Sequence, residues 1–365
     1  MPVNVLQVIG APCRQAGSFE RHLIRLAELG AARGMRLVAC YPSEPAALDV
    51  LRAAGIEVLV RPVRGKLDAS FANWVRSFGR SRGVGLVHGH FEPASFLAAF
   101  GARAAFVPAV LTRHYLASNP PRSLHALQTR ASARAARMTI AVSEPVRASL
   151  LGLGVPASRV RTLPLGVDRA RHAPPSGAQR NAARAAFGLG RDETAVLSTS
   201  HHRPGKGVDV LVDAAVKLGG GVTVLVAGDG PMTPELRRAA AERGLPVRFL
   251  GRVPDVRALL RAADVFVLPT DGYPEGLPMA AVEAMASGLP VVSTPVPAMA
   301  PLLRDAGVTV AAGDPGELAR ALNELAADAA ARERLGAAAR ERTEPFDLDR
   351  CAGAVLDLYE EVARR

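Results

Sequence analysis

Residues 275–293 read EGLPMAAVEAMASGLPVVS, and this stretch decides the fold prediction. Pro278 suits the first turn of a helix, because that position leaves the backbone N–H unpaired in any case, and Gly288 suits the residue just past a helix end. The pattern predicts a helix over roughly 278–287, followed by the apolar run PVVST of a buried strand. A helix joined to strands in this way is the repeating unit of α/β folds.

Two carboxylates stand eight positions apart around this helix. Glu275 lies just before it and Glu283 lies within it. The start of a helix attracts anions, because its first N–H groups, here those of residues 277–280, lack intrahelical partners and the helix dipole adds to the attraction. An ionised carboxylate accepts hydrogen bonds from two hydroxyls, which sugars supply. Each glutamate alone could be a solvated surface residue, but together they predict a site for a phosphate that carries sugar hydroxyls.

Apolar β-rich runs alternate with helical runs along the whole chain, as in β–α–β units. The candidate strands fall at 3–9, 36–41, 56–60, 84–88, 108–112, 138–142 and 160–164, and then at 195–200, 222–228, 247–251, 265–269, 290–294 and 308–312. The run RHAPPSGAQRN at 171–181 interrupts both patterns, as a linker would. Because 365 residues exceed the size at which one core stops growing, we predict an α/β protein of two doubly wound domains, with ligands bound in a cleft at the carboxyl ends of the strands.

The segment from Glu275 to Glu283 resembles the E-x7-E signature of the retaining family 4 glycosyltransferases, which have the two-domain GT-B architecture with Rossmann-like domains. The resemblance covers nearly the whole chain and is strongest from about residue 195 onward. It implies that Glu275 contacts the transferred sugar and that Glu283 binds the ribose hydroxyls of the nucleotide. Gly276, Leu277 and Pro278 then belong to the donor site. Four further segments resemble the family in its own order: VTVLVAGDGP, VRFLGRVPD, ADVFVLPT and GDPGELARALNEL.

The resemblance and the break at 171–181 together predict the domain boundaries. An acceptor-side domain is expected over 1–172, a linker over 173–185 and a nucleotide-sugar-binding domain over 186–345. A last amphipathic helix is expected over 346–365, and the resemblance implies that it packs back on the N-terminal domain.

The loop RPGKG contains one of only three lysines, Lys206, among 45 basic residues. It follows a strand and precedes a helical run, a place where loop N–H groups and an ammonium group can hold a diphosphate. In the resembled family an arginine and a lysine from this loop neutralise the leaving nucleoside diphosphate, and Lys206 aligns with the lysine. His201 stands at the usual place of the arginine, and Arg203 lies two residues nearer to Lys206. Both are therefore candidates for the second contact.

Two further turns resemble donor-binding segments of the family. The sequence Gly228-Asp229-Gly230 follows a strand, where small residues let the backbone approach the donor, although Gly-Asp-Gly is also an ordinary turn. Arg252 and Val253 follow the next strand, at a point that contacts the base in the family. The alternative is that Arg252 is a surface arginine without a role in donor binding.

Five residues of the first half complete the predicted site. Gly17 and Ser18 stand where the family usually has two glycines beside the donor. His114 follows a strand at a place where several members of the family contact the donor sugar or orient the acceptor, and we predict a catalytic role for it with Lys206 and Glu275. His88 and His90, at the end of another strand, are predicted on the acceptor side. They could equally be structural histidines, and no spacing indicates zinc.

Composition limits the class of partner. The net charge of +11 is uneven, because residues 1–170 carry 22 basic and 9 acidic side chains. A positive half attracts anionic acceptors, anionic lipid surfaces or nucleic acid, although an arginine-rich composition alone produces the same bias. Aromatic residues make up only 4%, too few for extensive base stacking, so no nucleic acid is expected. Three scattered cysteines and the lack of a leader or long apolar run lead us to expect a cytoplasmic protein, with peripheral contact at the inner face of the membrane left open.

The resemblance implies a retaining, metal-independent hexosyltransferase of glycan or cell-envelope biosynthesis. Its donor would be a UDP-sugar, with GDP and ADP left open, and its acceptor a hydroxyl of a glycan, a lipid-linked sugar or a small molecule. No metal or other cofactor is expected, because cationic side chains and the helix start would neutralise the leaving diphosphate. The alternatives are a GT-B nucleotide-sugar epimerase or phosphorylase, and a basic protein that binds nucleic acid or membrane.

Overall fold

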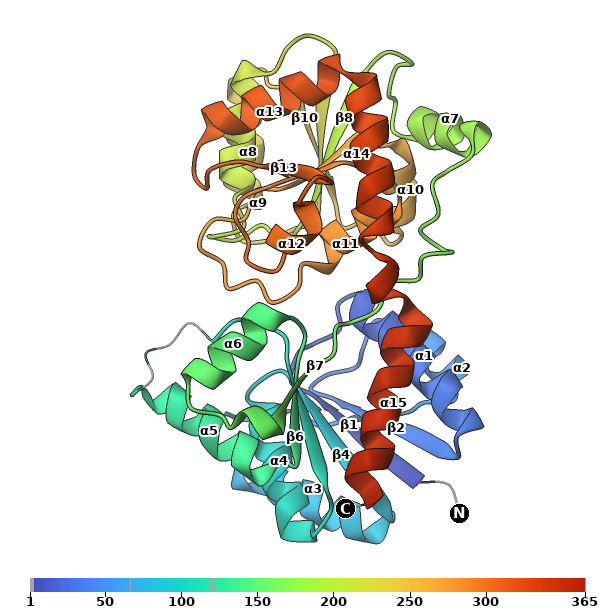
Figure 1. The fold of residues 1–365 in the computed structure, drawn as a ribbon, viewed down its shortest axis with the longest axis vertical. Helices are drawn as coiled ribbons and strands as arrows, with labels where there is room; N and C mark the ends of the chain where they lie inside the picture. The colour runs from blue at the N-terminus through green and yellow to red at the C-terminus, as the bar shows by residue number, and fades with distance from the viewer. Residues whose placement is uncertain (1–2, 66, 118–119, 121, 365) are drawn as a thin grey trace. The chain divides into compact units, whose positions relative to one another are not determined.

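The computed structural model describes residues 3–65, 67–117, 120 and 122–364, and its contacts divide them into two compact units (Figure 1). The first unit holds the chain up to Gly166, the short segment Pro274–Leu277 and everything from Leu348 onward. The second unit holds Val167–Tyr273 and Pro278–Asp347. Each unit is built on a parallel sheet of its own, which confirms the prediction of two doubly wound α/β domains.

The first unit has a seven-stranded sheet in the order β3-β2-β1-β4-β5-β6-β7, and all of its strand pairs are parallel. The strands are β1 (Val3–Ile9), β2 (Met35–Tyr41), β3 (Glu57–Val60), β4 (Val84–His90), β5 (Ala109–Arg113), β6 (Met138–Ala141) and β7 (Val160–Thr162). Its helices are α1 (Ser18–Ala32), α2 (Leu48–Ala53), α3 (Ala69–Ser81), α4 (Ala94–Ala105), α5 (Leu124–Ala135), α6 (Glu144–Gly152), the turn η1 (Ala157–Arg159) and α15 (Leu348–Arg364). The central strands β1 and β4 are largely buried, as expected for a parallel sheet that is covered on both faces.

The second unit has a six-stranded parallel sheet in the order β10-β9-β8-β11-β12-β13. Its strands are β8 (Thr194–Thr199), β9 (Val222–Ala227), β10 (Val247–Gly251), β11 (Val265–Leu268), β12 (Val291–Ser293) and β13 (Gly307–Thr309). Its helices and helical turns are α7 (Gly177–Ala186), α8 (Val208–Ala214), η2 (Ala215–Lys217), α9 (Thr233–Glu242), α10 (Val256–Ala262), α11 (Met279–Ala286), α12 (Ala300–Leu303), α13 (Pro315–Ala327), α14 (Ala329–Glu341) and η3 (Glu344–Phe346). The strand order reverses between β8 and β11, and ligands of such sheets bind at this point beyond the carboxyl ends of the strands.

The last helix, α15, packs along α1 of the first unit (Figure 1). Apolar residues at helical spacing are buried there, including Leu356 and Tyr359, and they join the same core as β1 and β2. Arg25 of α1 forms an ion pair with Asp349 at 2.6 Å, and Arg33 forms one with Asp357 at 2.5 Å. The helix α15 therefore belongs to the first unit, although almost two hundred residues separate it from the other strands and helices of that unit.

Two segments differ from the boundaries predicted from sequence. The segment 173–185 is not an open linker, because α7 begins at Gly177 with a capping box of Ser176 and Gln179. Arg184 of α7 is buried and forms an ion pair with Asp264 at 2.9 Å, which fixes the helix to the second unit. Residues 274–277, predicted within the second domain, contact the first unit instead.

No helix of the described residues is long and apolar enough to cross a lipid bilayer.

Candidate active site

The loop between β8 and α8 holds two cations on one tyrosine of the second unit. Nζ of Lys206 lies 4.1 Å from the centre of the Tyr273 ring, and Cζ of Arg203 lies 4.4 Å from it. Arg203 also donates a hydrogen bond to the Tyr273 hydroxyl. The Nε of Arg203 is buried and has no hydrogen-bond partner among the described residues. Both cations therefore gather at the carboxyl edge of the sheet, held by cation–π contacts.

Gly207 is the reason that this loop can approach the segment after β11. It is the N-cap of α8 with a left-handed φ of 70°, and a Cβ there would overlap the carbonyl oxygen of Pro269. Only glycine fits a position that combines positive φ with such a close backbone contact. Backbone packing alone therefore positions this loop, independently of its side chains.

The turn Gly228–Gly230 lies against the start of the same loop. Gly228 has a φ of 121°, and a Cβ there would overlap the carbonyl oxygen of Ser200. Oδ1 of Asp229 accepts hydrogen bonds from the N–H of Gly230 at 2.8 Å and from the Thr233 hydroxyl at 3.0 Å. The backbone N–H of His202 donates to the Asp229 carbonyl at 3.2 Å. These bonds join the predicted lysine loop and the predicted glycine-rich turn into one structure.

His201, the residue at the usual place of the family arginine, does not lie on Tyr273. Its Nδ1 contacts the carbonyl oxygen of Asp229. Its neighbour His202 stands in no recognisable motif and was not predicted; it is fully buried and contacts the Thr233 hydroxyl through Nδ1 at 2.8 Å. Arg252 pairs with Asp229 at 3.8 Å, so Arg252 and Val253 border the same turn. Of the two candidates for the second phosphate contact, Arg203 is the one that lies beside Lys206.

Replacing Gly228 by alanine is expected to destabilise the second unit by about 2–4 kcal/mol, because the change adds a steric clash to an unfavourable φ. Urea denaturation followed by circular dichroism measures the loss. Gly220→Ala is the matched control, since a Cβ at Gly220 has open space around it and should change stability by less than about 0.5 kcal/mol. Equal stability of the two variants would contradict the close packing of the turn.

The helix predicted over 278–287 is α11, Met279–Ala286, with Pro278 as its N-cap and Ser287 as its C-cap. Gly288 follows with a left-handed φ of 77°, as predicted for the residue past the end. Glu283 lies inside the helix with only 6% of its surface exposed. A carboxylate in such a buried position requires hydrogen-bonding or charged partners. The alternative interpretation of Glu283 as a solvated surface residue is therefore wrong.

Glu275 is held on the first unit by backbone contacts of its own segment. Tyr115 and Glu275 form an antiparallel bridge, and the N–H of Leu116 donates to the Pro274 carbonyl at 3.2 Å. The Ser143 hydroxyl donates to the Gly276 carbonyl at 2.7 Å. Glu275 is 7% exposed, so it is no solvated loop residue either.

The same segment brings Glu275 next to His114. A Cβ at Gly276 would overlap the His114 carbonyl oxygen, so the two strands of chain touch. Leu277 packs against a small apolar cluster that includes Val142 and Val146. The structure thus brings the backbone segments of two of the predicted catalytic residues together, although 161 positions of sequence separate them.

A buried polar network surrounds the predicted histidines of the first unit. Nε2 of Gln7 donates to the hydroxyl of Tyr359 on α15 at 2.9 Å, and that hydroxyl lies 2.5 Å from Nδ1 of His88. Nε2 of His90 contacts Oε1 of Gln7 at 2.9 Å, and Nδ1 of His90 lies 3.3 Å from Nε2 of His114. Sequence reasoning missed Gln7 and Tyr359, because neither stands in a recognisable motif.

This network fixes the tautomers of His90 and His114. The Gln7 oxygen accepts a hydrogen bond, so His90 carries its proton on Nε2 and uses Nδ1 as an acceptor. His114 must then donate from Nε2, which leaves its Nδ1 unprotonated. Burial lowers the pKa of His114 to about 3, and it holds the pKa values of His88 and His90 well below their usual range. All three histidines are therefore neutral at pH 7.

Gly17 and Ser18 begin α1 in the first unit. Gly17 is the N-cap, and its N–H donates to Oε2 of Glu20 at 2.9 Å. The backbone of Gly17 is extended and Ser18 is the first residue of α1 without a positive φ, so no left-handed conformation requires the second glycine that Ser18 replaces. Phe19 packs edge-to-face on His90 and His114, with ring centres 5.0 and 5.7 Å apart. The start of α1 therefore lies beside the histidine network.

The predicted residues thus form two groups. The first unit holds Gly17, Ser18, His88, His90, His114, Glu275, Gly276 and Leu277, and the second holds His201, Arg203, Lys206, Gly228, Asp229, Gly230, Arg252, Val253, Pro278 and Glu283. Within the ranges that the structure describes, no group of three or more His, Cys, Asp or Glu side chains is arranged to hold a metal ion.

The two halves of the chain match two family models. Residues 19–171 match Glycosyltransferase Family 4, and residues 193–328 match Glycosyl transferases group 1. A D-inositol 3-phosphate glycosyltransferase of Xylanimonas cellulosilytica is 30% identical and covers 100% of this chain and 97% of its own. A phosphatidyl-myo-inositol mannosyltransferase of Mycobacterium leprae is 30% identical over 95% of this chain and 94% of its own. The crystal structure of Anabaena HepE with UDP-glucose has the same fold, with a TM-score of 0.85 at 22% identity over 98% of this chain and 99% of that chain.

Proposed function

Because the chain belongs to the family 4, group 1 glycosyltransferases, we propose that it moves a hexose-type sugar from a UDP-sugar to a hydroxyl of an acceptor, with retention of configuration. One observation carries the choice of a nucleotide-sugar donor. The lysine loop, the glycine turn, Arg252 and α11 follow β8, β9, β10 and β11, so all lie at the carboxyl edge of one sheet. This is the edge at which doubly wound sheets bind nucleotides.

Each group of the second unit has a part in donor binding. Lys206 and Arg203 neutralise the diphosphate, together with the first N–H groups of α11. The buried, unpartnered Nε of Arg203 supports this role, because a diphosphate oxygen would supply its missing acceptor. Glu283 accepts the ribose hydroxyls, and the turn at Gly228 lets the backbone come close to the nucleotide. A solved relative in fold that holds UDP-glucose supports UDP as the carrier.

The chemical step needs no separate base. The bond between the anomeric carbon and the phosphate oxygen breaks, the acceptor oxygen bonds to that carbon on the same face, and the acceptor proton passes to the departing phosphate. Lys206 stabilises the charge that develops on this phosphate. Glu275 and His114 position the sugar and the acceptor hydroxyl, with His114 neutral and its Nδ1 available as an acceptor. No metal is required in this scheme.

The acceptor belongs to a class of polyols, glycans or lipid-linked sugars. One relative over the full length carries D-inositol 3-phosphate in its name and another carries phosphatidyl-myo-inositol, which makes inositol phosphates and their lipid-linked forms the first acceptors to test. The excess of arginine in the first unit would favour such anionic molecules. We propose a cytoplasmic location, because three free cysteines suit a reducing compartment, with the membrane surface as the source of a lipid-linked acceptor.

Glu283→Ala is expected to weaken donor binding at least about tenfold, because two charge-assisted hydrogen bonds to the ribose are lost. Thermal shift and calorimetry with UDP-, GDP- and ADP-sugars measure this, since a ligand of the folded state raises its melting temperature. Glu324→Ala, at an exposed glutamate of α13, is the matched control.

Three outcomes would contradict parts of the proposal. If none of the nucleotide sugars bound, the donor assignment would fail. If Glu283→Ala bound the donor as the control does, the role of Glu283 would be wrong. Rapid turnover of the UDP-sugar to its epimer without any acceptor would identify an epimerase instead of a transferase.

A further inference from the structure

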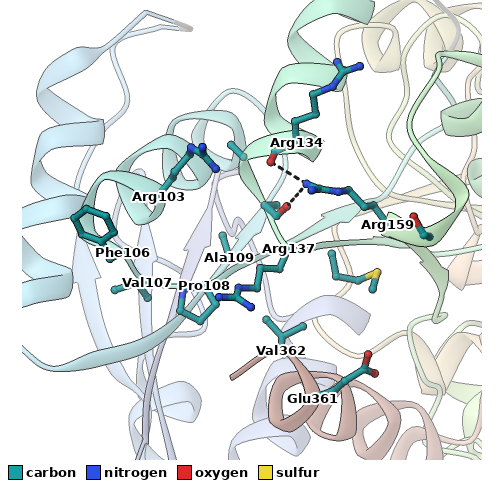
Figure 2. A pocket seen from close by; sticks show the side chains of 14 residues that line it. Arg103, Phe106, Val107, Pro108, Ala109, Arg134, Arg137, Arg159, Glu361 and Val362 are labelled. Atoms are coloured by element: carbon teal, nitrogen blue, oxygen red, sulfur yellow. Dashed lines mark hydrogen bonds between the residues drawn. The ribbon is translucent and has the colours of Figure 1, made fainter. Parts of the chain in front are cut away.

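A cavity of about 700 Å³ opens in the first unit at the amino ends of β5, β6 and β7 (Figure 2). The chain segments before these strands form its walls, and Glu361 and Val362 of α15 close one side. It lies at the opposite edge of the sheet from His114, which follows the carboxyl end of β5. The five residues of β5 separate the two places by roughly 16 Å at the usual rise of a strand. The cavity is therefore no part of the candidate active site.

Three arginines from different elements converge on this cavity. Arg103 comes from α4, Arg137 from the segment before β6 and Arg159 from η1. Figure 2 shows these three arginines among the side chains that line the cavity, whereas the guanidinium of Arg134 points away from them. Within the described ranges, Arg103 and Arg137 have no carboxylate at ion-pair distance. Three guanidinium groups so placed attract a group with several anionic oxygens.

The remaining charges of the cavity do not cancel these cations. Glu361 is the one acidic side chain of the lining, and its carboxylate pairs with Arg161 at 2.9 Å. Arg159 is half-buried, and its Nη1 donates to the carbonyl oxygens of Arg134 at 2.9 Å and Ala136 at 3.2 Å. Backbone carbonyls orient this guanidinium without neutralising it, so it is held in place before a ligand arrives.

An exposed aromatic ring stands at the rim of the cavity. Phe106 follows the last residue of α4 with a left-handed φ of 61°, and 91% of its surface is exposed. Both features are unfavourable for a phenylalanine. The left-handed backbone conformation favours glycine, and an exposed ring contributes no free energy of burial. An apolar ring beside arginines is the arrangement that contacts the headgroup region of an anionic bilayer.

We propose that this arginine cavity, formed by Arg103, Arg137 and Arg159, is a second anion site that binds a phosphate group. Phosphate monoesters and diesters offer the oxygens that bidentate guanidinium groups recognise. Such a phosphate has two sources, a phospholipid headgroup at a membrane surface or a soluble phosphorylated molecule. The site is independent of the sugar transfer proposed above, because no residue of the donor site lines it.

The test is the double variant Arg103→Glu/Arg137→Glu in the full chain. Calorimetry with inorganic tripolyphosphate and co-sedimentation with phosphatidylglycerol–phosphatidylcholine vesicles measure binding to the two sources. We expect at least about a tenfold loss of affinity in whichever assay the wild type binds. The charge-matched control carries the same kind of substitution at two exposed arginines elsewhere in the unit, Arg36→Glu/Arg76→Glu. An unchanged thermal shift with UDP-sugar verifies that the double variant is folded.

The variants also separate this site from the donor site. Binding of tripolyphosphate that survives Lys206→Ala but disappears in the double variant belongs to the arginine cavity. Binding of vesicles alone identifies a lipid phosphate as the source, and in that case Phe106→Ser should weaken it further. The proposal fails if the wild type binds neither probe, or if the control loses as much affinity as the double variant.

Discussion

Lys206→Met is expected to lower kcat/KM for sugar transfer about a thousandfold. The ammonium of Lys206 lies 4.1 Å from the Tyr273 ring, at the carboxyl edge of the second sheet, where the proposed mechanism places the diphosphate that gains charge as the sugar departs. Removing one preorganised charge from such a site costs roughly 10²–10³ in rate, equivalent to about 3–4 kcal/mol of transition-state stabilisation. Methionine keeps the length and the apolar stem of lysine, so packing on Tyr273 is largely preserved.

The division of this effect between kcat and KM identifies its origin. A charge that matters most when the bond breaks lowers kcat more than it raises KM, whereas lost ground-state binding would raise KM alone. Initial rates with a radiolabelled UDP-sugar and an inositol phosphate acceptor give both constants. Lys217→Met is the control, because Lys217 is exposed in η2 and lies outside the predicted site. Full activity of Lys206→Met would remove this lysine from the mechanism.

Acidification from pH 7 to pH 5 is expected to destabilise the first unit by about 4 kcal/mol through His22 and His114, with a further loss through His88 and His90. Burial lowers the pKa of His22 to about 4 and that of His114 to about 3, and it lowers the pKa values of His88 and His90 as well. The unfolded chain takes up these protons around pH 6.5, but the folded unit does not. Stability is therefore complete above pH 6.5 and falls as the pH drops toward the folded pKa values, by roughly 2 kcal/mol each for His22 and His114 at pH 5.

The single tryptophan makes this measurable for the first unit alone. Trp74 lies in α3, so its fluorescence during urea denaturation reports on that unit. His22→Gln should reduce the difference between pH 7 and pH 5 by about 2 kcal/mol, since it removes one of the four groups. His125→Gln, at a solvent-contacting histidine of α5, is the matched control. A free energy of unfolding that stays constant between the two pH values would show that the histidines are not held neutral.

Sequence patterns correctly predicted those features of the structure that depend on residues close together in the chain. The helix start at Pro278, the left-handed Gly288 and the strand positions all follow from short-range patterns. The capping box of Ser176 and Gln179 was also readable, and the prediction of a linker passed over it because prolines surround it. The candidate donor loop followed from Lys206 and its flanking glycines.

The remaining features depend on contacts between distant parts of the chain. Ser143 bonds the Gly276 carbonyl across 133 positions, and His88 contacts the Tyr359 hydroxyl across 271. Neither partner has a local pattern that names the other, so the place of Glu275 in the first unit and the neutral state of the histidines could not be predicted. Tyr273 was missed for the same reason. The count of charged residues predicted that the N-terminal half is basic. It could not predict that the fold brings Arg103, Arg137 and Arg159 to one cavity.

The place of α15 in the first unit also sets an order of events during synthesis. The ribosome makes every strand of the second sheet before it makes Tyr359, so that sheet can form while the earlier unit still lacks the helix that covers α1. Until then, the apolar surface of α1 and the hydrogen-bonding groups of Gln7 and His88 stay open to water. A released chain that ends at residue 347 would thus carry a complete second unit and an incomplete first one.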